Sequence, residues 1–470
     1  MYISLKGLTH MAIATVNPFT NRTVKSFSDD TPEMIEKSLT AAAAEFSRWR
    51  RTGYKERSAL LHKVAAILRG RKDELAKTIT TEMGKLIAES VGEIELSAAI
   101  FDYYADNGER FLADKPVKTE RGEAMIRHSP IGVVLGVEPW NFPFYQVARF
   151  AAPNIMIGNV VLVKLASNVP QCGIAIEDIF READAPAGLY TNLLIPGKGI
   201  AVLLGDARIK AASLTGSEEA GGSLAAAAGK NLKKSVLELG GSDAFIVLED
   251  ADIDKAAEWA FVGRMNNTGQ CCVASKRFIV VDAVADEFTT KFVARMSNLK
   301  VGDPLDATTK FGPLSSEAAA VHLADQVERA VKEGAKVLLG GQRIDRQGAF
   351  MEATVLTEIK PGSPVSYEEM FGPVAVIYRV KDEQAAITLA NDSPFGLGGS
   401  VFTADIERGK RVADQIDTGM VFINHPTWTA PELPFGGVKR SGYGRELSGL
   451  GVEEFVNKKL IRVSGLNDPF

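Results

Sequence analysis

The strongest constraint on the fold is the alternation of short apolar runs with segments of helical periodicity. Runs rich in β-branched residues at 132–137, 159–165 and 211–215 are separated by helical patterns, for example at 171–183. Strands that alternate with helices are typical of parallel sheets, because right-handed crossovers carry the chain from each strand to the next. Such sheets bind ligands at the carboxyl ends of their strands, so functional residues are expected there.

The same alternation starts again after Gly241, where a helical pattern at 253–267 is followed by a strand pattern at 277–281. The sequence therefore predicts an α/β protein with two parallel-sheet domains. Ahead of the first sheet, the periodicity predicts one long helix over about 72–111. Residues 456–463 alternate like an exposed strand, which pairs either with another subunit or with a strand of the same chain.

The composition excludes several classes of function. The 470 residues carry a net charge of −5, which is not the basic excess of a nucleic-acid-binding protein. Five histidines and three cysteines without a CxxC pair leave little for a zinc site, so we expect no metal. Sparse cysteines suit a reducing compartment. No apolar stretch approaches the roughly 20 residues of a membrane span, and no secretory pattern is evident, so we expect a cytoplasmic protein without membrane partners.

Two adjacent cysteines stand in a turn rich in asparagine and glycine. The run NTGQCC at 267–272 lies between a helical pattern and a strand pattern. A thiolate can attack a carbonyl carbon, and the backbone N–H groups of such a turn can stabilise the resulting anion. The alternative is a buried thiol that packs as a small apolar group, and we assign that role to the third cysteine, Cys172.

Two polar residues stand at the ends of predicted strands. Glu238, in VLELGGS, is either a general base whose pKa is raised by burial or a surface carboxylate at a strand edge. Asn141, in PWNFPF, has an amide that either donates to a developing oxyanion or forms a local Asx-turn.

The sequence contains no GxGxxG fingerprint of a dinucleotide site. It does contain TGSEEAG at 215–221, which follows a strand pattern and opens a helical one. The N-terminus of a helix suits a pyrophosphate, because free backbone N–H groups point at the ligand. The alternative is an ordinary capped helix.

Six motifs then occur in one order along the chain. They are PWNFP at 139–143, LTGSEEAG at 214–221, LELGG at 237–241, NTGQCC at 267–272, EEMFGPV at 368–374 and PFGGVKRSGYGRE at 434–446. Together they resemble the NAD(P)-dependent aldehyde dehydrogenase superfamily, and the resemblance extends over about residues 16–463.

The resemblance implies that an aldehyde is oxidised to a carboxylic acid through a cysteine thiohemiacetal and a thioester. It implies that Cys272 is the nucleophile, with Cys271 as the alternative, and that Glu238 is the general base. Asn141 and the backbone N–H of Cys272 would hold the oxyanion. The cofactor-binding residues implied are Trp140, Lys164, Ser167, Gly216, Ser217, Glu369 and Phe371.

The resemblance also implies a domain organisation and a homodimer or homotetramer. The expected parts are a Rossmann-like dinucleotide-binding domain at 1–111 and 131–240, a catalytic domain at 241–424, a return to the cofactor domain at 425–454, and a small β oligomerisation element formed by 112–130 and 455–470.

The cofactor expectation depends on one position. In this family an acidic residue three positions after Lys164 favours NAD, because it binds both ribose hydroxyls and repels a 2′-phosphate. Ser167 stands there instead, and a small neutral hydroxyl beside a lysine leaves room for the phosphate. We therefore favour NADP over NAD. The alternative is that Ser167 only caps the following turn.

The segments at 163–172 and 434–447 resemble those of bacterial succinate-semialdehyde dehydrogenases. Arg149 matches an arginine that binds the substrate carboxylate in those enzymes, and a guanidinium suits this task. The alternative is an ion pair at a helix surface or between subunits. Asn266 stands where some of these enzymes carry a second arginine, and Trp428 could instead line an apolar tunnel. Another small aliphatic or aromatic aldehyde therefore remains an alternative substrate.

Three other activities compete with this interpretation. A cysteine hydrolase or acyltransferase would need no nicotinamide contacts. A CoA-acylating aldehyde dehydrogenase typically dispenses with the base at Glu238. A non-catalytic binding protein would not need the Cys, Glu and Asn set.

Overall fold

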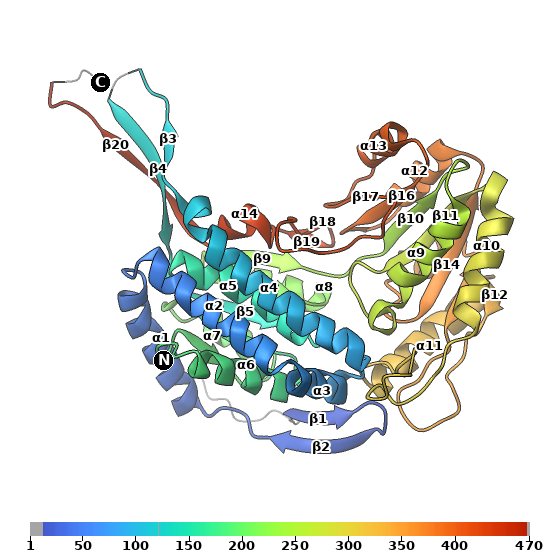
Figure 1. The fold of residues 1–470 in the computed structure, drawn as a ribbon, viewed down its shortest axis with the longest axis horizontal. Helices are drawn as coiled ribbons and strands as arrows, with labels where there is room; N and C mark the ends of the chain where they lie inside the picture. The colour runs from blue at the N-terminus through green and yellow to red at the C-terminus, as the bar shows by residue number, and fades with distance from the viewer. Residues whose placement is uncertain (1–12, 121, 468–470) are drawn as a thin grey trace.

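The structure is a computed structural model that describes residues 13–120 and 122–467. The parts of the predicted domains at residues 1–12, 121 and 468–470 lie outside the described residues. Two lobes lie side by side, and an arm of strands projects from the first lobe (Figure 1). The domain boundaries expected from the sequence stay a prediction, and the sheets are the units that the structure shows.

A six-stranded sheet forms the centre of the first lobe, in the order β19-β9-β8-β5-β6-β7. Its strands are β5 (Val133–Glu138), β6 (Val160–Leu165), β7 (Tyr190–Asn192), β8 (Ile209–Thr215), β9 (Lys234–Glu238) and β19 (Gly442–Tyr443). The strands from β5 to β9 run parallel, and β19 adds an antiparallel edge. Every residue of β6 is buried, as expected for a central strand that helices cover on both faces.

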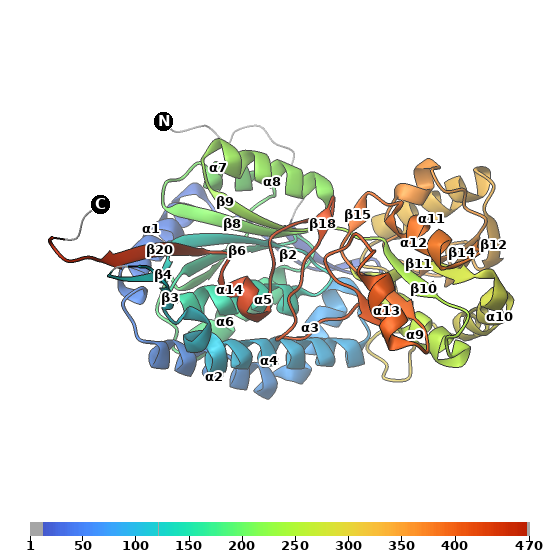
Figure 2. The ribbon, with the colours of Figure 1, turned by 90° about the horizontal axis from the view of Figure 1, so that it is seen from above.

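Helices cover both faces of this sheet (Figure 2). One face carries α5 (Pro143–Ile157) and α6 (Pro170–Glu182), with α2 (Tyr54–Gly70), α3 (Lys72–Met83) and α4 (Ile87–Leu112) outside them. The other carries α7 (Gly199–Leu204) and α8 (Glu218–Lys230). The chain first adds β6 and β7 on one side of β5 and then β8 on the other. This reversal opens a crevice at the carboxyl ends of β5 and β8.

The prediction of one helix over 72–111 is wrong, because the chain breaks into α3 and α4 at Gly84. Gly84 has a left-handed φ of 81° and ends α3. A Cβ there would lie 2.9 Å from a ring carbon of Pro313. Helical spacing of apolar residues continues across the break, so the periodicity alone does not reveal it. The helix α1 (Pro32–Trp49) begins after Thr31, whose side chain caps it by accepting the N–H of Met34.

A seven-stranded sheet forms the second lobe, in the order β12-β13-β14-β11-β10-β16-β17. Its strands are β10 (Asp243–Val247), β11 (Ser275–Val281), β12 (Lys336–Leu339), β13 (Thr354–Thr357), β14 (Val374–Val380), β16 (Gly399–Phe402) and β17 (Phe422–Ile423). All neighbours are parallel except β12 and β13. The predicted α/β class with two mainly parallel sheets is confirmed.

Two apolar clusters fasten helices to the second sheet. A phenylalanine-rich cluster lies under α9 (Ile253–Met265) and α10 (Asp282–Ser297). A cluster of smaller aliphatic residues lies under α11 (Glu317–Lys332), α12 (Glu383–Asn391) and α13 (Ile406–Ala413) on the opposite face. Burial of this kind contributes about 25 cal/mol per Å² of apolar surface, and it makes the second sheet a rigid support.

The arm consists of β3 (Lys115–Val117), β4 (Glu123–Pro130) and β20 (Val456–Val463) in the order β20-β4-β3, which confirms the strand predicted over 456–463. The remaining elements are β1 (Ile13–Asn17), β2 (Arg22–Phe27), η1 (Asn266–Gly269), η2 (Pro364–Tyr367), β15 (Phe395–Gly396), β18 (Val438–Lys439) and α14 (Ser448–Val452). Within residues 13–120 and 122–467, no helix is both long and apolar enough to cross a membrane.

The two sheets meet at the ends of their strands. The strand β9 ends at Glu238, and β10 of the second sheet begins at Asp243, after a short passage that contains Gly240 and Gly241. The carboxyl edge of the first sheet therefore adjoins the amino edge of the second, where β11 and β14 also begin. Residues that follow β5 and β8 can thus meet residues that precede β11 and β14.

Candidate active site

The segment that carries the two adjacent cysteines, residues 266–272, is called the cysteine turn below. Asn267 and Thr268 each have a φ of 53°, and Gly269 has a φ of 77°. Left-handed values are strained in residues other than glycine, so surrounding contacts must hold them. A Cβ at Gly269 would collide with the carbonyl group of Gly372, which explains the glycine at this position.

Two charged side chains hold this turn from outside. The Glu89 carboxylate of α4 accepts the backbone N–H of Asn267 at 2.9 Å. Arg264 of α9 is fully buried and donates to the carbonyl oxygens of Gly269, at 2.7 Å, and Gly372. Burial lowers the pKa of Arg264 to about 10. Since its guanidinium is occupied by backbone carbonyls, Arg264 is not available as a second arginine for a substrate carboxylate.

The two thiols of the turn differ in exposure. Cys271 is buried, whereas Cys272 is half-buried. The hydrogen-bonded Cys271 thiol and burial raise the pKa of Cys272, and the positive charges of Arg149 and Lys276 oppose them. The more accessible sulfur belongs to Cys272, as a nucleophile requires. Cys172 is fully buried in α6, as predicted for a core thiol.

Asn141 follows β5 and reaches the cysteine turn. Its side-chain amide donates to the carbonyl oxygen of Gln270 at 3.2 Å, and its own carbonyl oxygen accepts from the Asn267 amide at 3.0 Å. The side-chain oxygen of Asn141 accepts no hydrogen bond in the described part of the chain, so the alternative of a local Asx-turn is wrong. These contacts place an amide donor beside the backbone that leads into the thiols.

Glu238 ends β9 and is 2% exposed, so the alternative of a surface carboxylate is wrong. Neither of its carboxylate oxygens has a hydrogen-bond partner among residues 13–120 and 122–467. Burial raises the pKa of Glu238 well above its ordinary value, and the positive charge of Arg149 opposes this shift. A buried carboxyl group with a raised pKa and free oxygens can exchange a proton with a water molecule beside it.

Two glycines let the chain close around these groups. Gly241 packs so tightly on the cysteine turn that a Cβ there would lie 2.9 Å from the carbonyl oxygen of Cys272. Gly436, with a φ of 151°, approaches Glu238, and a Cβ there would lie 2.6 Å from its carboxylate oxygen. Only glycine leaves enough space at these two points.

Arg149 of α5 lies in a buried cluster of polar groups. Its side chain is fully buried and forms an ion pair with Glu446. It also donates to the hydroxyl groups of Thr215, at 3.0 Å, and Tyr145, at 3.3 Å. Arg149 does form an ion pair, but this ion pair is buried within the chain and does not lie at a helix surface. The charge of the Arg149 guanidinium also acts on the Cys272 thiol and opposes the rise in its pKa.

Three of the expected cofactor residues lie at the carboxyl edge of the first sheet. Lys164, in β6, is 8% exposed, and burial lowers its pKa. Gly216 donates its backbone N–H to the carbonyl oxygen of Glu238 at 3.0 Å. Ser217 caps α8 by accepting the N–H of Ala220 at 3.3 Å. The edge thus presents a buried cation and the positive end of a helix dipole.

Three further expected cofactor residues, Trp140, Glu369 and Phe371, come from both lobes. The rings of Trp140 and Phe371 meet edge to face, with 5.7 Å between their centroids. Glu369 accepts the backbone N–H of Gly241 at 3.1 Å and forms an ion pair with Lys276 at 3.0 Å. The structure therefore brings residues from two distant parts of the sequence into one cleft.

Comparisons with known proteins show the family of the chain. Residues 6–461 match the sequence model of the aldehyde dehydrogenase family.

The chain belongs to the aldehyde dehydrogenase family.

Its similarity to individual members extends over nearly the whole chain. It is 50% identical to the NADP(+) succinate-semialdehyde dehydrogenase of Deinococcus radiodurans, covering 96% of this chain and 94% of that protein. It is 47% identical to a probable NADP(+) succinate-semialdehyde dehydrogenase of Synechocystis, covering 97% of this chain and all of that protein. The crystal structure of succinic semialdehyde dehydrogenase from Streptococcus pyogenes in complex with NADP+ gives a TM-score of 0.95 at 44% identity, covering 96% of this chain and 100% of that one.

Three residues in the pocket of this aldehyde dehydrogenase were not singled out from the sequence. Tyr145 lies one helical turn before Arg149, so the i,i+4 spacing could have indicated it. Thr429 has no such signal, and it reaches the Tyr145 hydroxyl at 2.8 Å only through the fold. Lys276 stands beside Arg277 near the start of the fully buried strand β11, and a charge in such a strand is itself a signal.

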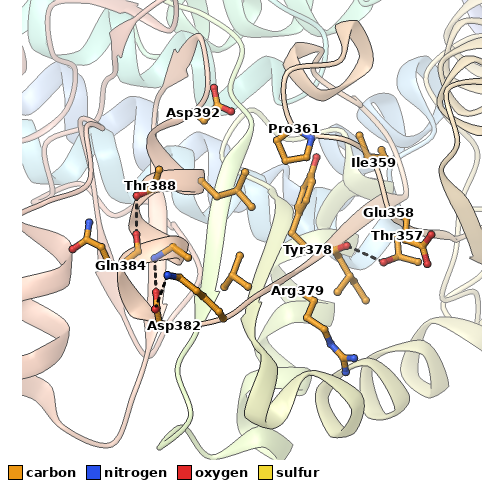
Figure 3. Close-up of a pocket in the computed structure, with 15 residues that line it drawn as sticks. Thr357, Glu358, Ile359, Pro361, Tyr378, Arg379, Asp382, Gln384, Thr388 and Asp392 are labelled. Carbon is orange, nitrogen blue, oxygen red and sulfur yellow. Dashed lines mark hydrogen bonds and ion pairs between the residues drawn. The ribbon is translucent and has the colours of Figure 1, made fainter.

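A groove of about 670 Å³ on the second lobe of the aldehyde dehydrogenase is not part of this site. It lies where β13 and β14 end and α12 begins, and its lining includes Ile359, Tyr378 and Asp382 (Figure 3). No residue predicted to act in catalysis or cofactor binding lines it. Arg379, on its border, forms an ion pair with Asp286. Volume alone therefore does not locate the active site.

We expect Cys272→Ala to abolish aldehyde oxidation and Cys271→Ala to retain most of it, because the Cys272 sulfur is the more exposed. Dinucleotide reduction at 340 nm measures the activity of both variants. Loss of activity in the Cys271 variant alone would make Cys271 the nucleophile instead.

We expect Gly436→Ala to slow turnover by about a hundredfold, the order that a general base contributes, because the new methyl group displaces the Glu238 carboxylate. Gly334→Ala is the matched control, since Gly334 also has a positive φ, of 107°, and a Cβ there would meet its nearest atom only at 4.0 Å. Mass spectrometry of the Gly436 variant during turnover should show an accumulated acyl-enzyme. An unchanged rate with no acyl-enzyme adduct would contradict the prediction that a side chain at position 436 displaces the Glu238 carboxylate.

Proposed function

We propose that this aldehyde dehydrogenase oxidises succinic semialdehyde to succinate with NADP as its cofactor. The observation that supports this most directly is the buried Arg149 guanidinium, which contacts the Tyr145 hydroxyl beside Thr429 and acts electrostatically on the Cys272 thiol. A cation beside hydroxyl donors suits a substrate with a carboxylate at the end away from its aldehyde. The relatives named above, whose names specify succinic semialdehyde and NADP, support the same substrate and cofactor.

The first chemical step belongs to Cys272. Its thiolate adds to the aldehyde carbon, and the carbonyl oxygen takes up the negative charge. The Asn141 amide and the backbone N–H of Cys272 hold this alkoxide, and loss of one such donor would raise the barrier by about 3 kcal/mol. The bound cofactor supplies the acceptor for the hydride that leaves this carbon, so that a thioester on Cys272 results.

The second step belongs to Glu238. Its carboxylate takes a proton from a water molecule, and the water oxygen attacks the thioester carbon. The bond between carbon and sulfur then breaks, so that the Cys272 thiolate returns and the oxygen of water stays in the product carboxylate. Glu238 and the new acid release their protons to solvent. Because burial raises the pKa of Glu238, its ionised form is a stronger base than an exposed carboxylate.

The residues present fit a phosphorylated dinucleotide. Lys164 is a mostly buried cation whose pKa is lowered by burial. Such a cation suits a ribose or a phosphate group. Gly216 and the N-cap Ser217 directly precede α8, whose first-turn N–H groups suit a pyrophosphate. Ser167 lies in the turn after β6, where its carbonyl oxygen accepts the N–H of Ala14 at 3.2 Å. A serine adds no negative charge beside Lys164, so this corner of the cleft accepts the 2′-phosphate of NADP.

Arg149 and Thr429 would hold the carboxylate end of the substrate. Arg149 is closed off from solvent, and its contact with the Tyr145 hydroxyl, at 3.3 Å, is longer than its contact with Thr215. We infer that the substrate carboxylate takes the place of this longer contact and accepts from Arg149 and from the Thr429 hydroxyl. The ion pair between Arg149 and Glu446 then stays intact.

We also propose that the arm joins copies of the chain into a homodimer or homotetramer. The strand β20 is the edge of its sheet, and its Leu460 and Val463 are 64% and 55% exposed. An edge strand with exposed apolar side chains is a template for pairing with another chain. The three cysteines are free thiols, which supports placing the enzyme in the reducing cytoplasm.

The proposal is tested by incubating the purified chain with succinic semialdehyde and either dinucleotide and recording absorbance at 340 nm. We expect kcat/KM with NADP+ to exceed that with NAD+ by at least about tenfold, as one added charged contact can provide. Reduction that requires CoA would favour an acylating enzyme. Ester hydrolysis without any reduction would favour a cysteine hydrolase.

We expect Arg149→Lys and Thr429→Val each to raise KM for succinic semialdehyde at least about tenfold more than KM for butanal, the aldehyde of equal length without the carboxylate. Arg149→Ala is unsuitable, because leaving Glu446 buried without its partner destabilises a fold by about 3–5 kcal/mol. Equal effects on the two aldehydes would assign Arg149 a structural role.

A further inference from the structure

Lys276, near the start of β11, is 2% exposed, yet its ammonium group has a partner for each of its three N–H bonds. It donates to the carbonyl oxygens of Cys272, at 2.8 Å, and Cys271, at 3.0 Å. Its third contact is the carboxylate of Glu369, at 3.0 Å. A lysine is rarely buried without such partners. One side chain thus joins the backbone of both cysteines to an acidic residue that precedes β14.

Glu369 belongs to the cofactor side of the cleft. Its side chain is 19% exposed, so its carboxylate can meet a ligand in the cleft. It also accepts the N–H of Gly241 at 3.1 Å, and a Cβ at Gly240 would collide with its second oxygen. Phe371, two residues further on, faces Trp140 across the cleft. The carboxylate that neutralises Lys276 is therefore one that a ligand in this cleft would reach.

Other charged and titratable groups also act on the two cysteines or on Lys276. Asp243, at the start of β10, is buried; burial raises its pKa to about 6, and the charge of Lys276 opposes this shift. Arg149 of α5 is paired with Glu446, and burial raises the pKa of Tyr145 on the same helix to about 12. Cys271 shares a hydrogen bond with Cys272, and burial keeps the pKa of Glu238 raised. Lys276 therefore acts on the Cys272 sulfur, and its acidic partner, Glu369, is one of the expected cofactor residues.

We propose that Lys276 couples occupation of the cofactor cleft to the reactivity of Cys272. This inference rests on the proposed function, in which the hydroxyl groups of the nicotinamide ribose engage Glu369. A carboxylate that accepts hydrogen bonds from a sugar shares less of its charge with the ammonium group. The charge of Lys276 then acts more fully on the cysteine turn and favours the thiolate of Cys272. Lys276 is a positioning residue, since it touches the backbone of the nucleophile and not the substrate.

The experiment measures alkylation of Cys272 by iodoacetamide across pH, with and without NADP+ and without aldehyde. It uses the Cys271→Ala background, so that Cys272 is the reactive thiol, since Cys172 is fully buried. We expect NADP+ to accelerate alkylation near pH 7 about tenfold, the change that a shift of one pKa unit brings. Lys276→Met should reduce this acceleration to less than about twofold, whereas Lys276→Arg, which keeps the charge, should retain most of it.

Glu369→Gln provides a test without any cofactor. Removing the carboxylate charge should accelerate alkylation of the cofactor-free protein, so that added NADP+ changes the rate little. Unchanged alkylation in Glu369→Gln, or full acceleration by NADP+ in Lys276→Met, would overturn the coupling. Protein fluorescence titration of NADP+ and thermal melting report binding and folding of each variant. Reduction at 340 nm by the unaltered chain with succinic semialdehyde separates these outcomes from failure of the proposed function.

Discussion

The active site depends on a close approach of two sheet edges that only a glycine backbone permits. At Gly241 a Cβ would lie 2.9 Å from the carbonyl oxygen of Cys272, and at Gly240 it would collide with Glu369. This contact sets the carboxyl edge of one sheet against the amino edge of another. Each lobe therefore supplies part of the proposed site: Glu238 and Asn141 belong to the first lobe, and Cys272 belongs to the second.

The pocket holds more charge than a protein interior normally tolerates. Glu138, Glu238 and Glu446 all act electrostatically on the guanidinium of Arg149 or on one another, and all are buried. One buried cation cannot stabilise three ionised carboxylates in a medium of low dielectric, so burial raises the pKa of Glu138 and Glu238. The pocket therefore retains a proton where an exposed set of acids would lose it, which suits a site that must accept and release protons.

The sequence predicted the parts of the site that short motifs carry, and it missed the parts that depend on distant contacts. Asn141, Glu238 and Cys272 stand in motifs whose residue types already indicate chemistry. The fold brings Asn141 into contact with the cysteine turn and buries Glu238. The contact between Tyr145 and Thr429 joins residues 284 positions apart, so no local pattern encodes it. The break at Gly84 was missed because apolar spacing continues on both sides. Catalytic and cofactor roles follow from resemblance and await the experiments above.

Ser441 has a consequence for how the two lobes stay together. This fully buried residue donates its hydroxyl proton to the carbonyl oxygen of Gly240 at 2.7 Å and accepts the N–H of Gly396 at 3.0 Å. The Ser441 hydroxyl therefore joins the passage between the two sheets, at Gly240, to the strand β15, at Gly396. Hinge opening would strip two hydrogen bonds from a dry interior, at a cost of about 1–3 kcal/mol for each group left unsatisfied. The two hydrogen bonds of Ser441 therefore oppose separation of the lobes beside Gly240.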